Sequence, residues 1–198
     1  MITDKRARLT VKGSYNLPLQ GPGQNLKVSG DVKSLVFPYN PTITYSRPAN
    51  YGAYDLAHTN YQPRYFSNTS SPNIQLTALF TNNTEEEMNY TIGALHFLRV
   101  VSLMHYGEND EFRGTPPPVL LFSAYGKNNY QNFPVVVTSV DYTLDSDLDY
   151  VESADGTNLP AQLFIAVSLA HQPDLIATRK QFTVDAIANG SLLGRGFL

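Results

Sequence analysis

The sequence predicts a mainly β protein: an antiparallel two-sheet β-barrel or sandwich with one flanking α-helix at about residues 85–106. Short runs of β-branched and aromatic residues, each closed by Pro, Asn or Gly, recur along the chain. Apolar and polar residues alternate in residues 73–80 and 163–169, as in strands with one buried face. Only one segment has sustained helical spacing, and strands on both sides of a single helix favour an antiparallel sheet over repeated βαβ units.

The length of 198 residues predicts a single domain with its own core. Residues 1–30 combine Gly, Pro, Gln and Asn and are interpreted as an extended N-terminal arm or a disordered tail, with one strand at residues 7–12. Residues 31–198 form the β domain with a C-terminal extension. Residues 47–70 hold four tyrosines without a long period, which predicts an ordered connection or a surface loop.

The helix has signals at both ends. Thr84 and Glu87 form a capping box, and Glu85 and Glu86 place negative charge at the positive end of the helix dipole. Gly107 supplies the expected stop. The residues at helical spacing, which we expect to face the core, are Tyr90, Ala94, Phe97, Leu98, Val101 and Met104, with Ile92 and Leu95 beside them.

Further strands are expected after the helix. Three prolines, 116–118, force an extended lead into the apolar run 119–122. Residues 133–144 read as another strand. Residues 182–197 are ambiguous between a short helix and an extended arm.

Composition favours an assembly over a lone enzyme or a nucleic-acid reader. Charged residues are only 16% of the chain, so we expect Asn, Ser, Thr, Gln and the 13 Tyr to cover much of the surface. Such a composition suits a surface that is partly buried between subunits. The net charge of −3 and the lack of a Lys or Arg run disfavour a nucleic-acid-binding protein that contacts the phosphate backbone. No signal peptide and no membrane-length apolar run is apparent, so we expect a cytoplasmic protein or one carried in a particle assembled there.

The best candidate metal site is an acidic run, Asp145, Asp147, Asp149 and Glu152, whose alternate carboxylates resemble the start of a calcium loop. Tyr150 stands where such a loop needs Gly, so we expect no bound metal. These acids are interpreted as a solvated turn or as an acidic rim that repels phosphate.

No catalytic pattern is visible. The four histidines lack a partner at useful spacing, and the chain has no Cys, no HExxH and no GxSxG motif. We therefore expect no enzymatic activity and no cofactor, with a hydrolase built from distant acids as the remaining catalytic alternative.

Several segments, in order, carry a family resemblance: YDLAHTNYQPRYF, FLRVVSLMHYG, GTPPPVLLFSAYG, NFPVVVTSVDYTLDSDLDYV and LPAQLFIAVSL. Over residues 33–185 the chain resembles the tail-tube-like baseplate proteins of large contractile-tailed bacteriophages, in particular the tail tube initiator or cap. The resemblance implies a β-barrel of tail-tube type with a helix on its side.

It also implies a structural role: a homohexameric ring whose subunits join their sheets into one inner barrel. Such a ring would link the baseplate hub to the tail tube within the virion, and DNA would pass through its lumen during ejection without specific binding, and with no membrane contact. Asp145, Asp147 and Asp149 then fall at the rim or lumen. The alternative is a receptor- or carbohydrate-binding β-module of a virion, which the Tyr-rich residues 45–66 favour.

Overall fold

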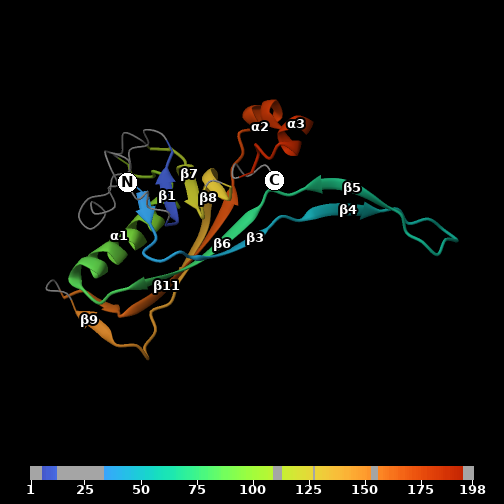
Figure 1. Cartoon of the computed structure of the whole chain (residues 1–198). Helices are drawn as coiled ribbons and strands as arrows, with labels where there is room; N and C mark the ends of the chain where they lie inside the picture. The colour runs from blue at the N-terminus through green and yellow to red at the C-terminus, as the bar shows by residue number, and fades with distance from the viewer. Residues whose placement is uncertain (1–5, 13–33, 109–112, 127, 153–155, 194–198) are drawn as a thin grey trace.

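The computed structural model describes residues 6–12, 34–108, 113–126, 128–152 and 156–193, and over these residues the protein is mainly β (Figure 1). One large antiparallel sheet carries the core, a long helix covers one of its faces, and two further strand pairs and two short helices extend from it. The mainly β, antiparallel class is confirmed. The strands of the large sheet are continuous in one sheet, not divided between two.

The large sheet has seven strands in the order β2-β1-β7-β8-β11-β6-β3, and every neighbouring pair is antiparallel. The strands are β1 (Arg8–Val11), β2 (Ser34–Val36), β3 (Thr42–Ser46), β6 (Asn73–Thr81), β7 (Leu120–Ala124), β8 (Tyr130–Tyr142) and β11 (Gln162–His171).

The sheet is strongly curled, because its two edge strands, β2 and β3, are joined only by residues 37–41. An extended chain reaches at most about 3.6 Å per residue, so this link spans about 20 Å. The edges of a flat seven-stranded sheet would lie about 29 Å apart at about 4.8 Å per strand. The link is also held to the β1 side of the sheet, since Phe37 N–H donates to the Ala7 carbonyl at 2.9 Å. The result is a partly rolled barrel.

Strand alternation places the core on the inner face of this curl. In β6 every second residue from Ile74 to Phe80 is buried, and β11 repeats the pattern from Leu163 to Leu169. These side chains meet the buried face of helix α1 (Glu85–Val101) in a single hydrophobic cluster. Burial of this apolar area is the main stabilising term, at about 25 cal/mol per Å².

The start of α1 has the predicted cap at Thr84, but the carboxylate of Glu87 accepts from a different backbone N–H group than a capping box requires. Thr84 Oγ1 accepts a hydrogen bond from Glu87 N–H at 3.3 Å, and Glu85, Glu86 and Glu87 occupy the first turn. The Glu87 carboxylate accepts from the N–H of Asn83, at 3.0 Å, not from that of Thr84. Side chains therefore satisfy one N–H group of the first helical turn, that of Glu87, and the N–H group of Asn83 just before the cap.

The predicted end of the helix is wrong. α1 ends at Val101, where Ser102 Oγ donates to the Arg99 carbonyl and closes the last turn, so neither Gly107 nor residues 102–106 belong to it. Of the predicted core face, Ala94, Phe97, Leu98 and Val101 are buried, and Tyr90 is partly buried against the core. Met104 lies beyond the helix and is 48% exposed, because the apolar spacing continues past the point where the backbone leaves the helix.

Strand β1 confirms the strand predicted at residues 7–12. It lies inside the sheet between β2 and β7, and its Leu9 and Val11 are buried, so residues 8–11 belong to the core of the domain. The rest of the predicted N-terminal arm, residues 1–5 and 13–30, lies outside the described residues.

Two further strand pairs and two helices complete the described structure. Strands β4 (Ala49–Ala53) and β5 (Arg64–Thr69) form a hairpin that extends far from the sheet (Figure 1), and residues 49–69 are called the long hairpin below. Strands β9 (Tyr150–Glu152) and β10 (Asn158–Pro160) pair at the opposite end. The ambiguous C-terminal region includes α3 (Val184–Ala188), which follows α2 (Leu175–Gln181).

Candidate assembly surfaces

The sheet has an unpaired edge at β3. β3 pairs with β6 on one side, and no other strand of the described chain pairs with it on the other side. Most of its residues are exposed, including Thr42, Thr44 and Tyr45. An uncovered edge offers a row of backbone donors and acceptors to another strand, and natural proteins rarely leave one free unless it is used.

A second unpaired edge lies along the later half of β8. β7 pairs with β8 only between Tyr130 and Val135, whereas β11 follows β8 to Tyr142. Residues 136–142 therefore have a strand on one side only, within the part of the chain that the structure describes. β8 is long enough to pass beyond β7 and expose this edge.

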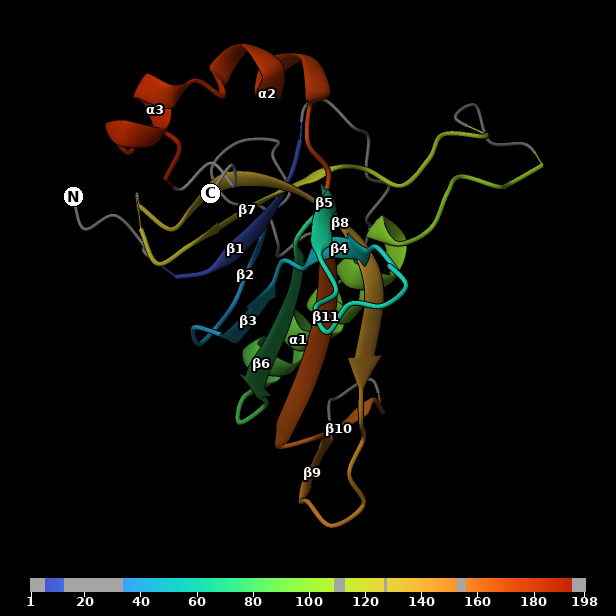
Figure 2. The ribbon, with the colours of Figure 1, turned by 90° about the vertical axis from the view of Figure 1, so that its right-hand side faces the viewer.

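The two edges are complementary in direction. β3, β6, β11 and β8 lie side by side, each antiparallel to the next (Figure 2), so β3 and β8 run in opposite directions. Thr44, Gln75, Ser168 and Ser139 stand in one row across these strands, all on the face opposite the core. A second copy placed beside the first by rotation would present its β8 edge antiparallel to β3.

The other terminal strand, β2, is covered within the chain. The Tyr90 hydroxyl of α1 accepts from Val36 N–H at 3.0 Å and donates to the Val36 carbonyl. One side chain thereby takes the place that a neighbouring strand would fill at this residue. Of the two terminal strands, β2 therefore has its outer edge bonded at Val36, whereas we take the edge of β3 as open to a partner.

The long hairpin carries aromatic side chains on both faces. Tyr51 meets Phe66 edge-to-face at 5.7 Å between ring centroids, and Tyr54 meets Tyr65 at 4.7 Å. The Tyr65 ring lies over Gly52, where a Cβ atom would come within 2.3 Å of it. The segment that the sequence predicts as an ordered, tyrosine-rich connection is thus a two-stranded arm, and its aromatic side chains are largely exposed.

A groove runs between β2 and the first turns of α1, and we call it the helix groove. Its volume is about 510 Å³. Its apolar part is formed by Val36, Pro38, Tyr39 and Tyr90, and its charged residues are Arg6, Glu86 and Glu87. The groove therefore combines aromatic side chains with charges of both signs.

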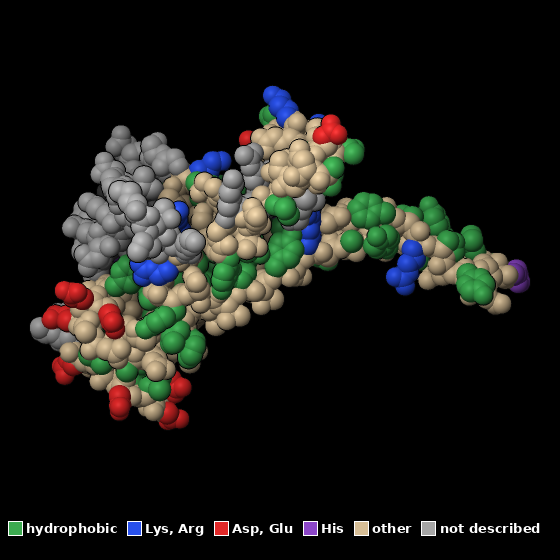
Figure 3. Space-filling view, viewed as in Figure 1, with side chains coloured by type: hydrophobic (Ala, Val, Ile, Leu, Met, Phe, Trp, Pro, Cys, Tyr) green, Lys and Arg blue, Asp and Glu red, His purple; other side chains and the backbone are tan. Residues whose placement is uncertain are grey.

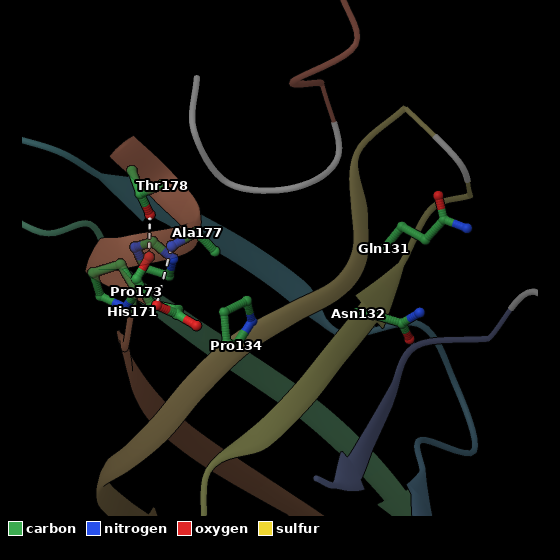
Figure 4. Close-up of a pocket in the computed structure, with 8 residues that line it drawn as sticks. Gln131, Asn132, Pro134, His171, Pro173, Ala177 and Thr178 are labelled. Carbon is green, nitrogen blue, oxygen red and sulfur yellow. Dashed lines mark hydrogen bonds between the residues drawn. The ribbon is translucent and has the colours of Figure 1, made fainter. Parts of the chain in front are cut away.

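A smaller hollow of about 380 Å³, the end pocket, lies between the start of β8 and α2 (Figure 4). Gln131 and Asn132 lie on one side, and His171 and Thr178 on the other. His171 stacks on Phe133 at 4.5 Å, and burial, with a smaller contribution from Arg47, lowers the pKa of its imidazole. The stacking on Phe133 and the partial burial show that the His171 ring packs against the end of the sheet.

The described residues contain no group of three or more His, Asp or Glu placed to hold a metal ion. Asp145, Asp147 and Asp149 are exposed on the loop between β8 and β9. Asp145 Oδ1 accepts from Asp147 N–H at 3.1 Å, and the Tyr150 hydroxyl donates to the Asp145 carbonyl at 2.9 Å. These bonds shape a turn at the end of the sheet.

Acidic side chains gather at the end of the molecule that holds β9 and the start of α1, whereas hydrophobic side chains follow the long hairpin at the other end (Figure 3). The hairpin carries Arg64. The acidic side chains and the exposed hydrophobic side chains of the hairpin thus lie at opposite ends of the molecule. Sequence reasoning located the acids and the tyrosines, but not their separation to opposite ends.

No protein-family model and no curated protein matches the chain. Among the described helices, none has the length and apolar character needed to cross a membrane. The geometry of the unpaired edges and the long hairpin is therefore the basis for a functional proposal.

Proposed function

We propose that this chain is a structural, non-enzymatic subunit of a phage tail: a baseplate or tube protein of the initiator type that assembles with itself into a hexameric ring. The ring links the baseplate hub to the tail tube in the virion and surrounds the channel through which DNA leaves. The observation that carries the proposal is the pair of complementary unpaired edges, β3 and residues 136–142 of β8.

Pairing of β3 in one copy with residues 136–142 of β8 in the next copy would cover both unpaired edges. Each copy contributes β8, β11, β6 and β3, an even number of alternating strands, so β3 of one copy meets β8 of the next antiparallel and the alternation continues. Such a contact is heterologous, and heterologous contacts close into rings when the rotation between copies allows it. A closed barrel leaves no edge for aggregation.

The face opposite the core suits a channel for DNA. Its central row consists of Thr44, Gln75, Ser168 and Ser139, which offer hydroxyl and amide groups and no positive charge. Affinity for DNA depends mainly on Lys and Arg contacts to phosphates, so such a lining lets the polyanion pass. The exposed loop with Asp145, Asp147 and Asp149 would stand at the rim of this channel and repel phosphate.

Disulfide trapping tests the edge contact directly, because the chain has no Cys of its own. We expect a Thr44→Cys, Ser139→Cys double variant to form cross-linked ladders under mild oxidation, since facing residues on adjacent strands bring their Cβ atoms close enough. A staggered ring would instead cross-link Thr44→Cys with Val136→Cys or Asp141→Cys, which share the same face.

Two controls define the result. Tyr45→Cys points to the opposite face from Thr44, so its combination with Ser139→Cys should give no ladder. Thr44→Cys alone should stay uncross-linked, because dimers of this single variant would indicate two-fold pairing of β3 with β3. Absence of ladders from all three outward-facing pairs would refute the ring contact.

The alternative function is a receptor- or carbohydrate-binding module of a virion, and the exposed aromatic rings of the long hairpin favour it. Aromatic faces stack on sugars, and a shallow aromatic surface is typical of such modules. Binding of the isolated chain to a glycan array, lost in a Tyr51→Ala, Phe66→Ala variant, would support this alternative. No binding, together with ladder formation, supports the ring.

A further inference from the structure

We propose that the helix groove is a strand-addition site, in which an extended peptide segment of another protein pairs with β2. The segment carries a Lys or Arg beside an apolar residue, and the Tyr90 hydroxyl holds its place until it binds. The site uses neither the β3 edge nor residues 136–142 of β8, so it goes beyond the proposed ring and does not depend on it.

Val36 directs both of its backbone hydrogen-bonding groups away from β1. In an antiparallel pair, successive residues of a strand alternately face the partner strand and face away from it. Phe37 N–H donates to the Ala7 carbonyl on the β1 side, so Val36 faces the other way. There its N–H and its carbonyl both bond to the Tyr90 hydroxyl. A strand added to β2 would bond to these same two groups.

Exchange of the Tyr90 hydroxyl for a strand keeps Val36 fully hydrogen-bonded. The segment replaces the two hydrogen bonds of the hydroxyl with two of its own, and the released hydroxyl bonds to water. Tyr90 itself lines the groove, which gives its ring a space to move into. The side-chain contacts of the segment therefore decide whether it binds.

The helix groove has the size that a short strand needs. Its volume of about 510 Å³ lies within the range of about 300–1,000 Å³ that is typical of binding sites. Ser34 and Val36 of β2 lie on one side of it, and Glu86, Tyr90 and Thr91 of α1 on the other. At about 3.3 Å per residue, β2 offers about 10 Å of strand for pairing.

The lining of the groove specifies the side chains of the segment. Pro38 and Tyr39 offer an apolar surface, and Tyr39 is 51% exposed. Arg6 already has an interaction within the chain, and the Glu87 carboxylate accepts a backbone N–H at the helix start. Glu86 is exposed, and within the described part of the chain it makes no hydrogen bond or ion pair. Its carboxylate is therefore available to a Lys or Arg of the segment.

The unpaired strands of this chain do not match the groove. β3 (Thr42–Ser46) and residues 136–142 of β8 contain no Lys or Arg, so neither would place a positive charge beside Glu86. We therefore assign the segment to another protein and not to a second copy.

A labelled model peptide tests the site through fluorescence anisotropy. The probe is KTVYVTK, blocked at both ends, which alternates in the manner of a strand and carries Lys, Val and Tyr. We expect saturable binding to the unmodified chain. Tyr90→Phe should tighten binding about fivefold, because the peptide no longer displaces a hydroxyl from Val36. Glu86→Gln should weaken binding about tenfold, because it removes the charge that faces the peptide lysine.

Two controls separate strand pairing from contact through side chains alone. The same peptide with N-methyl groups on alternate residues keeps its side chains but loses backbone donors, and it should not bind. Val36→Pro removes the N–H that faces the groove without removing a bond to β1, and it should abolish binding. Tyr39→Phe removes a hydroxyl from the same groove that does not bond to Val36, so it should not tighten binding.

The increase in affinity for Tyr90→Phe is the decisive result, because a hydroxyl with only a structural role would leave binding unchanged or weaker. Unchanged or weaker binding to Tyr90→Phe, or equal binding of the N-methylated peptide, would overturn the strand-addition site. Self-association of the chain without peptide, strengthened by Tyr90→Phe in sedimentation velocity, would make a second copy the occupant and overturn the assignment to another protein. Cross-linked ladders of the Thr44→Cys, Ser139→Cys variant report on the ring alone, so each proposal can fail without the other.

Discussion

The contact between α1 and the curled sheet depends on Phe97, and its truncation gives the sharpest stability prediction. Phe97 is fully buried, at 0% exposure, within the cluster that joins the helix to the sheet strands. Phe97→Ala removes a ring from a packed interior and leaves a cavity, which costs about 3–5 kcal/mol. This is a large share of the roughly 5–15 kcal/mol that stabilises a typical domain.

Urea denaturation at a fixed protein concentration measures the effect. With a slope of about 2 kcal/mol per M, a loss of about 4 kcal/mol moves the midpoint down by roughly 2 M. Phe97→Leu keeps most of the volume and should cost about 1 kcal/mol, so it remains measurable if Phe97→Ala does not fold. Tyr106→Ala, on an exposed side chain, should change the free energy of unfolding by less than about 0.5 kcal/mol. A near-neutral Phe97→Ala would refute the assignment of the core face.

Three further predictions concern the cap, the end pocket and the acidic rim. Thr84→Ala removes the side-chain acceptor at the start of α1 and should cost about 1 kcal/mol in urea denaturation, whereas Thr84→Ser should be close to neutral. The lowered pKa of His171 means that the unfolded chain takes up a proton before the folded chain does, so stability should fall as the pH drops below about 6.5. His171→Gln should flatten this decline, and an unchanged pH profile in this variant would contradict the assignment. The triple variant Asp145→Asn, Asp147→Asn, Asp149→Asn should leave cross-linked ladders intact, and a chelator should not affect them, whereas chelator-sensitive ladders would reveal a bound metal.

Local signals in the sequence account for much of the fold. Alternation in residues 73–80 and 163–169 predicts β6 and β11, because one buried face imposes a period of two on a strand. Thr84 predicts the start of α1 because a hydroxyl at that position satisfies a backbone donor. The helix end is different: Leu103 and Met104 keep an apolar pattern after Val101, so periodicity alone overruns it.

Local sequence patterns do not predict which distant strands pair with each other. The sheet is continuous because β8 passes from β7 to β11 along its length, and a single long strand carries no signal of two different partners. The long hairpin was predicted only as a connection, since its aromatic residues alternate irregularly around a bulge between Asn50 and Tyr51. Helix α2 had a readable signal, because Asp174 caps it by accepting from the N–H groups of Ile176 and Ala177.

Some features of the candidate surfaces could be predicted from the sequence, and others could not. The sequence located the tyrosines of the long hairpin and the acids of the β8–β9 loop, since both are visible as composition. The unpaired edges depend on which strands pair, and the helix groove depends on how α1 lies beside β2. These features follow from tertiary contacts, so only the structure could supply them.

The central claim is that copies of this chain join their sheets edge to edge around a channel. Electron microscopy of the purified chain at high concentration, alone and with tail tube and hub proteins, tests it most directly. We expect end-on views with six-fold symmetry and a central hole. Monomers alone, or closed two-fold dimers, under all of these conditions would contradict the account.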